Sequence, residues 1–345
     1  MKCAKIGNRM VGDGYPCFIS LEPGATHTGL ESAKMMVEAA AAAGADAVKF
    51  QTVMADELMS NEDVMIDYQT PMGKRSESVY AALKRRELTF DEWRELKDYC
   101  DKQKILFISA PSGPATVDLL AEIGSAAIKV SKSDVNNRYL IKLIAAKGLP
   151  VIMDAREKFE DVQVGIDICE TAGVKDIIIM HCPSGYPVQY AGIHLKAIPH
   201  IKAIFDYPVA YSDHSVGDHM NYAALGVGAN YLEKTITLDR STNAVEHFMS
   251  LEPSELKHFV DNIRNIEEAF GDPRIIFSSR VNATHRRSIL AERTIKKGQT
   301  IAIEDLGFKR PGTYISVERY EEIVGAKATR DIPAGEFLAE ADFEK

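Results

Sequence analysis

Residues able to bind anions and cations follow short apolar runs at several points before residue 250. Lys49 and Lys129 each stand near the end of such a run, and an ammonium group is a compact donor that meets a phosphate or carboxylate from several directions. His214 and His247, with a carboxylate such as Glu22, have the donor types of a divalent cation that polarises a carbonyl oxygen. Their spacing matches no compact metal motif, so only a fold that brings them together would make a site.

The polar residues near the ends of the apolar runs form one set that is rich in lysines, histidines and carboxylates. Any single member has a second interpretation, as part of a salt bridge or as a buried histidine with its own partners. One shared site explains the whole set better, because the carboxyl ends of the strands of a parallel barrel face the substrate. The set comprises Glu22, His27, Lys49, Gln51, Lys129, Ser131, Lys132, Asp134, His181, Ser184, Tyr186, Ser212, Asp213, His214, Glu233, Lys234, Glu246 and His247.

Eight apolar, β-branched runs alternate with amphipathic stretches between residues 10 and 271, which is the pattern of a parallel sheet wrapped by helices. Eight βα units over about 260 residues have the size expected of a (β/α)8 TIM barrel. A doubly wound open sheet is the competing architecture, and the near-equal spacing of the units favours closure. The predicted strands are Cys17–Leu21, Ala47–Gln51, Ile105–Ser109, Ala127–Val130, Val151–Met153, Ile177–Met180, Val209–Tyr211 and Tyr231–Lys234.

Two connections are far longer than a plain βα loop. The first, Thr52–Leu88, follows the second predicted strand, and the second, Thr235–Pro253, follows the eighth. Loops of such length are usually functional or disordered. We expect the first to form part of the wall of the active site.

The pattern changes after Gly271, where helical periodicity stops and short strands with Gly and Pro turns begin. Segments 294–306 and 331–343 resemble each other, with a glycine and an aspartate at the same offsets, so a small pseudo-symmetric β domain is predicted. We therefore divide the chain into a barrel domain of residues 1–272, a linker of residues 273–287 and a β-rich domain of residues 288–345. The equivalent pairs are Gly298 with Gly335 and Asp305 with Asp342.

Composition excludes several classes of function. A formal net charge of −9 provides no overall positive field for nucleic acid. No apolar run approaches the roughly 20 residues that span a bilayer, and the first residues lack the apolar core of an export signal. The 5 cysteines are scattered and form no C-x-x-C pair, so we interpret them as reduced thiols of a cytoplasmic protein. Neither G-x-G-x-x-G nor a P-loop motif occurs.

The polar residues at the strand ends, taken in their order along the chain, resemble the motifs of the sialic acid synthase family. Enzymes of that family join phosphoenolpyruvate to an N-acylated amino-sugar aldehyde. The resemblance covers nearly the whole chain, and its C-terminal part is similar to the antifreeze-like (SAF) domain of that family. The matching stretches are LEPGATHTG, AGADAVKFQT, IKVSKSDVNN, IMHCPSGYP, YSDHSVG, LEKTITLDR with EHFMSLEP, and IKKGQTIAIEDLGFKRPG.

The resemblance implies a transferase that makes a nine-carbon 2-keto-3-deoxy acid, a bound Mn²⁺ or Mg²⁺, and a domain-swapped homodimer. Glu22 or Asp134 would move protons. The remaining roles fall into three groups: phosphoenolpyruvate binding by Lys49, Gln51, Lys129, Ser131, Ser184 and Ser212; sugar binding by Glu22, Tyr186, Asp213, Glu246 and, across the dimer, Arg310; and metal binding by His214 and His247.

Some positions depart from the family pattern. Thr235 stands where the family has a metal-ligating histidine, so either His247 or a nearby acid completes the metal site or metal binding is lost. Asp134 replaces a glutamate, and Lys132 and Asp154 replace small polar residues. These departures indicate a divergent branch of the family, whose sugar is either N-acetylmannosamine or a related 2,4-diacylamino hexose and whose product is sialic acid or another nonulosonate.

Two other functions remain open from the sequence. A degenerate barrel could bind a sugar or phosphoenolpyruvate as a sensor without turnover, which the missing histidine favours. A related synthase class makes shorter keto-deoxy acids from phosphosugars, and it would need Lys132 and the run Lys84-Arg85-Arg86 near the sugar tail. We interpret that run as a solvated helix face. The C-terminal domain is interpreted as a lid rather than as a solubility appendage, because Lys309 and Arg310 lie on an exposed turn.

Overall fold

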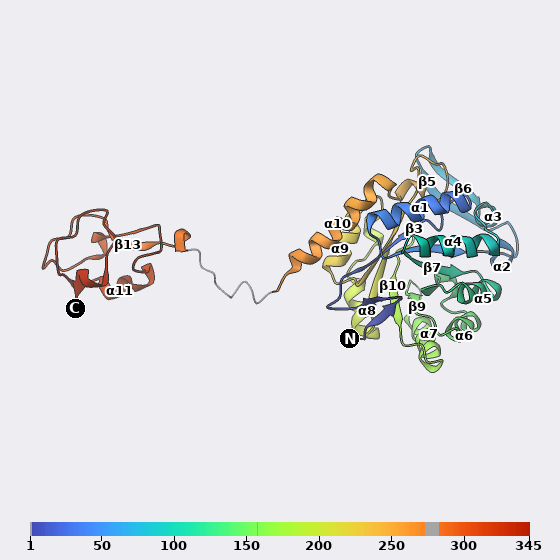
Figure 1. Ribbon diagram of the computed structural model, residues 1–345, viewed down its shortest axis with the longest axis horizontal. Helices are drawn as coiled ribbons and strands as arrows, with labels where there is room; N and C mark the ends of the chain where they lie inside the picture. Colours follow the sequence, from blue (N-terminus) through green and yellow to red (C-terminus); the bar gives the residue numbers. More distant parts are fainter. Residues whose placement is uncertain (1, 157, 273–282) are drawn as a thin grey trace. The chain divides into compact units, whose positions relative to one another are not determined.

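The computed structural model describes residues 2–156, 158–272 and 283–345, which divide into a unit of residues 1–270 and a unit of residues 271–345 (Figure 1). Each unit is described by itself. Most of the predicted linker, residues 273–282, lies outside the described residues. No helix among the described residues is long and apolar enough to cross a membrane.

Unit 1 contains a closed barrel of parallel strands, which confirms the predicted TIM barrel. The last strand pairs with the first, with Tyr231 opposite Phe18, and this pairing excludes an open doubly wound sheet. In order around the barrel the strands are β3 (Phe18–Glu22), β4 (Ala47–Thr52), β7 (Leu106–Pro111), β8 (Ala127–Val130), β9 (Val151–Asp154), β10 (Ile177–His181), β11 (Val209–Asp213) and β12 (Tyr231–Thr235).

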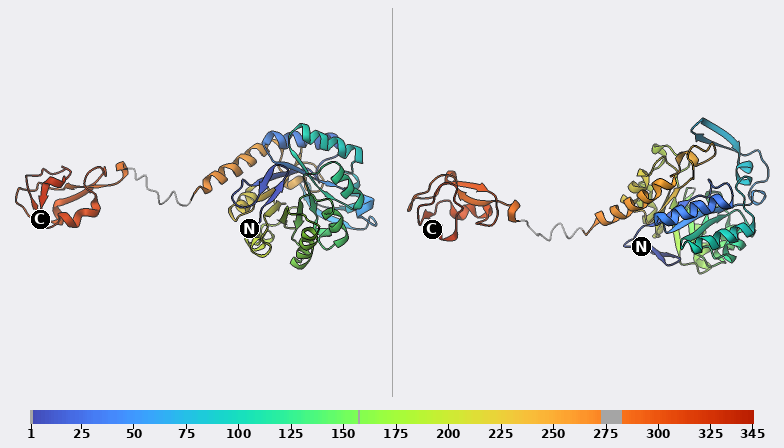
Figure 2. Two further views of the ribbon diagram at one scale, coloured as in Figure 1. Left: turned by 60° about the horizontal axis from the view of Figure 1, so that its bottom comes forward. Right: turned by 45° about the horizontal axis from the view of Figure 1, so that its top comes forward.

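Helices cover the outside of the barrel (Figures 1 and 2). Local sequence sets their ends: Thr89 and Glu92 form a capping box at the start of α4, and α1 ends at Gly44, whose φ is 86°. The helices are α1 (Leu30–Ala43), α4 (Phe90–Lys102), α5 (Pro114–Glu122), α6 (Arg138–Ala145), α7 (Phe159–Thr171), α8 (Ala197–Phe205), α9 (His219–Gly226) and α10 (Pro253–Phe270).

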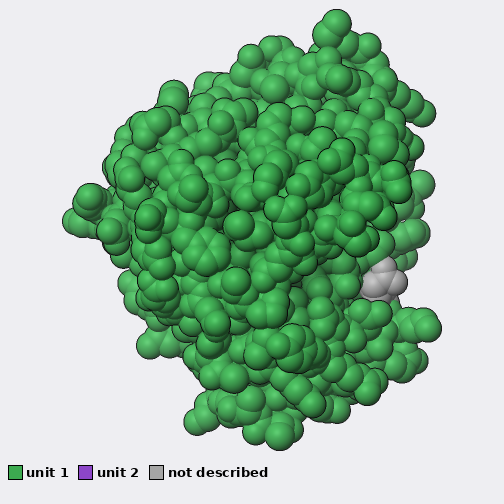
Figure 3. Space-filling model, turned by 90° about the vertical axis from the view of Figure 1, so that its right-hand side faces the viewer, with its two compact units in different colours: residues 1–270 green, residues 271–345 purple. Residues whose placement is uncertain are grey.

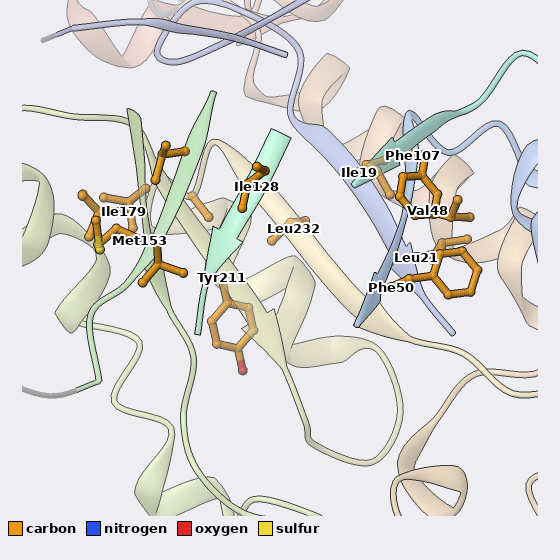
Figure 4. Close-up of a cluster of buried hydrophobic side chains, with 14 of the residues drawn as sticks. Ile19, Leu21, Val48, Phe50, Phe107, Ile128, Met153, Ile179, Tyr211 and Leu232 are labelled. Carbon is orange, nitrogen blue, oxygen red and sulfur yellow. The ribbon is translucent and has the colours of Figure 1, made fainter. Parts of the chain in front are cut away.

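The alternation of side chains along each strand divides the core into two layers. Outward residues such as Ile19, Leu21 and Phe50 pack against the helices (Figure 4). Inward residues such as Phe18 and Ile152 fill the amino-terminal half of the barrel interior. On most strands the next inward position is polar, so the interior changes from apolar to polar toward the carboxyl ends. These polar positions are Ser20, Lys49, Lys129, Asp154, Ser212 and Glu233.

A hairpin that the sequence analysis missed precedes the barrel. Strands β1 (Ala4–Ile6) and β2 (Arg9–Val11) pair antiparallel around a turn that includes Gly7, whose φ is 58°. Ala4, Ile6 and Val11 are fully buried in the same cluster as the inward residues of the strands. The hairpin therefore extends the apolar layer of the barrel interior.

The long connection after β4 has secondary structure of its own: α2 (Ala55–Leu58), β5 (Met65–Thr70), β6 (Gly73–Ser78) and α3 (Val79–Lys84). The backbone N–H of Gln69 donates to the carbonyl of Tyr186 at 2.9 Å, which ties the β5–β6 hairpin to the loop after β10. Figure 3 shows the surface of unit 1 from the right-hand side of Figure 1.

Unit 2 is small and β-rich, as predicted. Its two similar segments also share local structure: the Nε of Arg293 donates to Asp305 at 2.6 Å, and the Nε of Arg330 donates to Asp342 at 2.7 Å. Each aspartate also accepts a backbone N–H three residues earlier in the chain. The elements of this unit are β13 (Ser288–Ala291), β14 (Leu306–Lys309), α11 (Tyr320–Ile323), β15 (Lys327–Ala328) and β16 (Phe343–Glu344).

Candidate active site

A cavity of about 760 Å³ lies at the carboxyl ends of the barrel strands, where the sequence analysis expected the site. The long connection after β4 contributes Val53, Leu58 and Leu83 to its wall, which agrees with the role expected of that connection. Most of the predicted site residues line this one cavity: Glu22, Lys49, Gln51, Lys129, Ser131, Asp134, Ser184, Tyr186, His214 and Glu246.

Glu233 joins three predicted phosphoenolpyruvate ligands. Its Oε1 accepts from the Nζ of Lys129 at 3.1 Å and from the Oγ of Ser212 at 2.8 Å, and it lies 3.5 Å from the Nζ of Lys49. Burial alone would raise the pKa of this carboxyl, but the charges of Lys129 and Lys49 outweigh burial and lower the pKa to about 2. The ionised carboxylate therefore holds two ammonium groups together. Sequence reasoning placed Glu233 at a strand end but gave it no role.

Lys129 is protonated in this environment. Burial acts to lower the pKa of its ammonium group, but the negative charge of Glu233 overcomes burial and raises the pKa. Lys129 is 5% exposed and borders the cavity, so its fixed positive charge is suited to an anionic ligand.

Glu22 accepts hydrogen bonds from Lys49 and, at 3.1 Å, from the Nε2 of Gln51. The Oε1 of Gln51 in turn accepts from the Nη2 of Arg86 at 3.0 Å. Lys84 and Arg85 do pair with acidic residues on the surface, but Arg86 turns inward, so the predicted solvated face is wrong for this residue. Sequence periodicity could not have singled out Arg86, because it follows the end of α3.

Glu22, His214 and Glu246 form a group that could hold a metal ion. One donor atom from each lies within 4.8 Å of the others, and all three residues are buried. The Oε2 of Glu246 and the Oγ1 of Thr235 are buried without a hydrogen-bond partner. A cation would satisfy the unpartnered carboxylate oxygen, and two carboxylates with one imidazole suit a divalent ion.

The charges of this group act on one another. Burial would lower the pKa of His214, but the nearby Cys182 and the carboxyls of Glu246 and Glu22 raise the pKa to about 9. Burial raises the pKa of Glu246, and repulsion from Glu22 adds to the effect. The two carboxyls and the imidazole thus interact strongly in a buried place, and such mutual pKa shifts are typical of functional sites.

His247 does not belong to this group, and its role as a metal ligand stays a prediction. The φ of Glu246 is 69°, and the 3-10 helix His247–Met249 starts directly after it. This turn directs the Glu246 carboxylate into the cavity and the His247 ring to the Oγ1 of Thr237, 2.7 Å away. Of the two ways to complete the site, a nearby acid is the one that the geometry offers.

Asp213 also lies outside the cavity. Its neighbour Ser212 faces inward, so Asp213 faces the helix layer, where it binds Lys234 at 2.8 Å and Asn221 at 2.7 Å. Its contact with the sugar stays a prediction that this outward position does not support. Ser212 itself is 1% exposed and donates to Glu233 beneath the cavity.

The predicted site residues Tyr186, Asp134 and Arg310 lie in three different places. The ring centroid of Tyr186 is 5.4 Å from that of His214. Asp134 accepts from Ser133 at 3.0 Å within the 3-10 helix Lys132–Asp134. Arg310 is exposed in unit 2, and its role in sugar binding stays a prediction.

Arg156 is a cavity residue that sequence reasoning missed. It follows β9, and its guanidinium lies against Asp154, with Nη2 to Oδ2 at 2.7 Å. The sequence does contain a signal, because Asp154 replaces a small polar residue of the family pattern at a strand end, and a buried carboxylate requires a partner.

Two parts of the chain match known families: residues 36–274 match the NeuB family and residues 286–344 match the SAF domain. N,N'-diacetyllegionaminic acid synthase of Legionella pneumophila is 34% identical over 336 residues, which cover 95% of this chain and 94% of the relative. Pseudaminic acid synthase of Campylobacter jejuni is 31% identical over 332 residues, covering 95% and 96%. The solved structure of N-acetylneuraminic acid synthetase from Leptospira borgpetersenii superposes with a TM-score of 0.70 at 28% identity, covering 79% of this chain and 92% of that chain.

Proposed function

Because the chain belongs to the NeuB family, we propose that it condenses phosphoenolpyruvate with an N-acylated amino-sugar aldehyde. The products are a nine-carbon 2-keto-3-deoxy acid and inorganic phosphate. The acceptor is N-acetylmannosamine or a related 2,4-diacylamino hexose. Relatives named as synthases of N,N'-diacetyllegionaminic acid and pseudaminic acid support a synthase of this class.

One observation carries the proposal. Two lysines that meet on Glu233 and the buried group Glu22, His214 and Glu246 border the same cavity. The reaction requires both features, since the donor is an anion and the carbonyl of the acceptor must be made electrophilic.

Lys49 and Lys129 bind phosphoenolpyruvate in this proposal, and the hydroxyls of Ser131 and Ser184 at the cavity wall add hydrogen bonds to it. Glu233 keeps the two ammonium groups in place before the substrate arrives, so little reorganisation is needed on binding. Gln51, which is held by Glu22 and Arg86, has its amide fixed beside the same ligand.

Glu22, His214 and Glu246 would hold Mn²⁺ or Mg²⁺, whose chemistry when bound is to polarise the aldehyde oxygen. C3 of phosphoenolpyruvate then forms the new bond to the aldehyde carbon, and water adds at C2. Cleavage of the C2–oxygen bond releases phosphate and leaves the ketone. Of the two protons of water, one ends on the new hydroxyl and one on phosphate.

Asp134 is the group that we propose to move the proton from water. Glu22 already accepts from Lys49 and Gln51 and belongs to the metal group, whereas Asp134 lines the cavity on another strand end. Tyr186 and Glu246 line the sugar site.

We propose that the chain acts as a homodimer in which Arg310 of one copy binds the acyl group of the sugar held by the other. This arrangement is tested by mixing two variants, Arg310→Ala and Lys129→Ala. In a mixed dimer, the chain with intact Lys129 lacks its own Arg310, so activity returns only if its active site receives Arg310 from the second copy. No recovery in the mixture would contradict this arrangement.

The function is tested by incubating the protein with phosphoenolpyruvate, Mn²⁺ and a panel of 2-acylamino sugars while phosphate release is measured. We expect release with at least one member. Phosphoenolpyruvate binding without release from any acceptor would favour the sensor function.

An acceptor that carries a phosphate is a second candidate, favoured by the inward guanidinium of Arg86 beside Gln51. The same panel therefore includes 6-phosphorylated sugars. Faster turnover of these than of the free sugars, abolished in Arg86→Gln, would select this candidate.

A further inference from the structure

Asp154 and Arg156 form an ion pair at the end of β9. Asp154 is fully buried, while the Arg156 side chain is 15% exposed and lines the cavity. The Nε of Arg156 donates to both carboxylate oxygens at 3.0 and 2.9 Å, and its Nη2 lies 2.7 Å from Oδ2. The carboxylate thus holds one edge of the guanidinium in a fixed position.

The order of strands gives this pair a definite side of the cavity. β9 neighbours β8, and Lys129 on β8 stands opposite Ile152, two residues before Asp154. The metal group comes from β3, the residue after β11 and the loop after β12, and β10 separates β9 from β11. Arg156 therefore follows the strand next to that of Lys129, and the charge of Asp154 acts on the Lys129 ammonium group.

We propose that Arg156, held by Asp154, binds the phosphate group of phosphoenolpyruvate at the β8–β9 side of the cavity. The inference rests on the proposed function. A planar guanidinium meets phosphate oxygens through paired N–H donors, which an ammonium group cannot do. Phosphate leaves as a dianion, so a fixed guanidinium at this position stabilises the charge that develops on the leaving group. Asp154 is a positioning residue that acts through Arg156.

The test measures phosphoenolpyruvate binding to the full chain by calorimetry, without an acceptor. We expect Arg156→Gln to raise the Kd about 10- to 100-fold, as the loss of a charge-assisted bidentate contact predicts. Asp154→Asn should raise it less, and adding Asp154→Asn to Arg156→Gln should cost nothing further, because the two residues act as one unit. In turnover, the KM of phosphoenolpyruvate should rise and that of the acceptor should stay within about twofold. Arg138→Gln removes the same charge at the start of α6, outside the cavity lining, and serves as the matched control.

Folding is checked by thermal melting, because Arg156→Gln leaves the carboxylate of Asp154 buried without its partner. If that variant does not fold, the phosphoenolpyruvate Kd is measured on the double variant Asp154→Asn with Arg156→Gln, in which both side chains are neutral. Inorganic phosphate provides a second probe, and its inhibition constant should rise by the same factor as the phosphoenolpyruvate Kd.

The outcomes separate the two claims. An unchanged phosphoenolpyruvate Kd in both Arg156→Gln and the neutral pair overturns the role of Arg156 and leaves the proposed function intact. A raised acceptor KM with an unchanged phosphoenolpyruvate Kd assigns Arg156 to the acceptor and also overturns it. If the wild-type chain binds no phosphoenolpyruvate, the proposed function itself fails.

Discussion

The carboxylate of Glu233 on β12 lies 3.1 Å from the ammonium nitrogen of Lys129, although the two residues belong to strands on opposite sides of the barrel. The interior is narrow enough for long side chains to meet across it, as in other eight-stranded barrels. Glu233 is fully buried, so its charge is felt strongly by both lysines that it contacts. Glu233 is the carboxylate that the two lysines share at the base of the cavity.

Glu233→Gln should weaken phosphoenolpyruvate binding by about 100-fold, because the two buried ammonium groups lose the negative charge that they share and repel each other. It should also lower the free energy of unfolding by about 3 kcal/mol. Calorimetric titration and urea denaturation measure the two effects.

Asp213→Asn is the matched control, since Asp213 and Lys234 form an equally buried pair on the outer face of β11 and β12. That variant should lose comparable stability yet keep its affinity for phosphoenolpyruvate. Equal losses of affinity in both variants would mean that Glu233 acts only through the stability of the barrel.

Stability should fall in acid because of His27. Both of its ring nitrogens are buried without a hydrogen-bond partner. The centroid of its ring lies 5.8 Å from the ring centroid of Phe50 and 6.1 Å from that of Trp93. Burial lowers the pKa of His27 from 6.5 to about 3. Between these two pH values the imidazole is protonated in the unfolded chain and neutral in the folded chain. The stability present above pH 6.5 is therefore lost as pH falls toward 3, by up to about 1.4 kcal/mol per pH unit.

Urea midpoints of the wild type and of His27→Leu measured between pH 7 and pH 4 isolate this contribution. The variant should lose stability less steeply with acid, because other titrating groups affect both chains equally. Identical slopes would show that His27 is protonated in the folded chain.

Gly185→Ala should impair activity while the barrel stays folded. Gly185 lies between Ser184 and Tyr186 with a φ of 140°, and an added Cβ would lie 2.8 Å from the Cα of Val188. The loop must shift, which moves a hydroxyl and an aromatic ring of the cavity wall. We expect kcat/KM to fall about 10- to 100-fold, measured by phosphate release, as a displacement of about 1 Å predicts.

Gly173→Ala is the control, because Gly173 also has a positive φ but nothing lies within 4 Å of an added Cβ. Its backbone strain should lower the melting temperature without changing kcat/KM. An active Gly185→Ala enzyme would show that the loop after β10 tolerates displacement.

The barrel and the location of the site could be predicted from sequence because both follow from period-two alternation and from the shared end of parallel strands. The same alternation also separates inward Ser212 from outward Asp213 and inward Glu233 from outward Lys234, so applying it strand by strand places Asp213 on the outer face of the barrel. Loop residues are different. Whether Glu246 or His247 enters the cavity depends on one backbone φ that has no sequence signature.

Metal binding should depend on Glu246 and not on His247. Glu246 offers a buried oxygen without a hydrogen-bond partner beside Glu22 and His214, so its loss removes a ligand, and Glu246→Gln should weaken Mn²⁺ binding about 100-fold. His247 is occupied by Thr237, so His247→Ala should leave Mn²⁺ affinity within about twofold. Free Mn²⁺ counted by electron paramagnetic resonance gives both affinities without any substrate. Chelation should also abolish phosphate release, and added Mn²⁺ should restore it in the wild type and in His247→Ala. Loss of Mn²⁺ binding in His247→Ala with unchanged binding in Glu246→Gln would show that His247, and not Glu246, is a metal ligand.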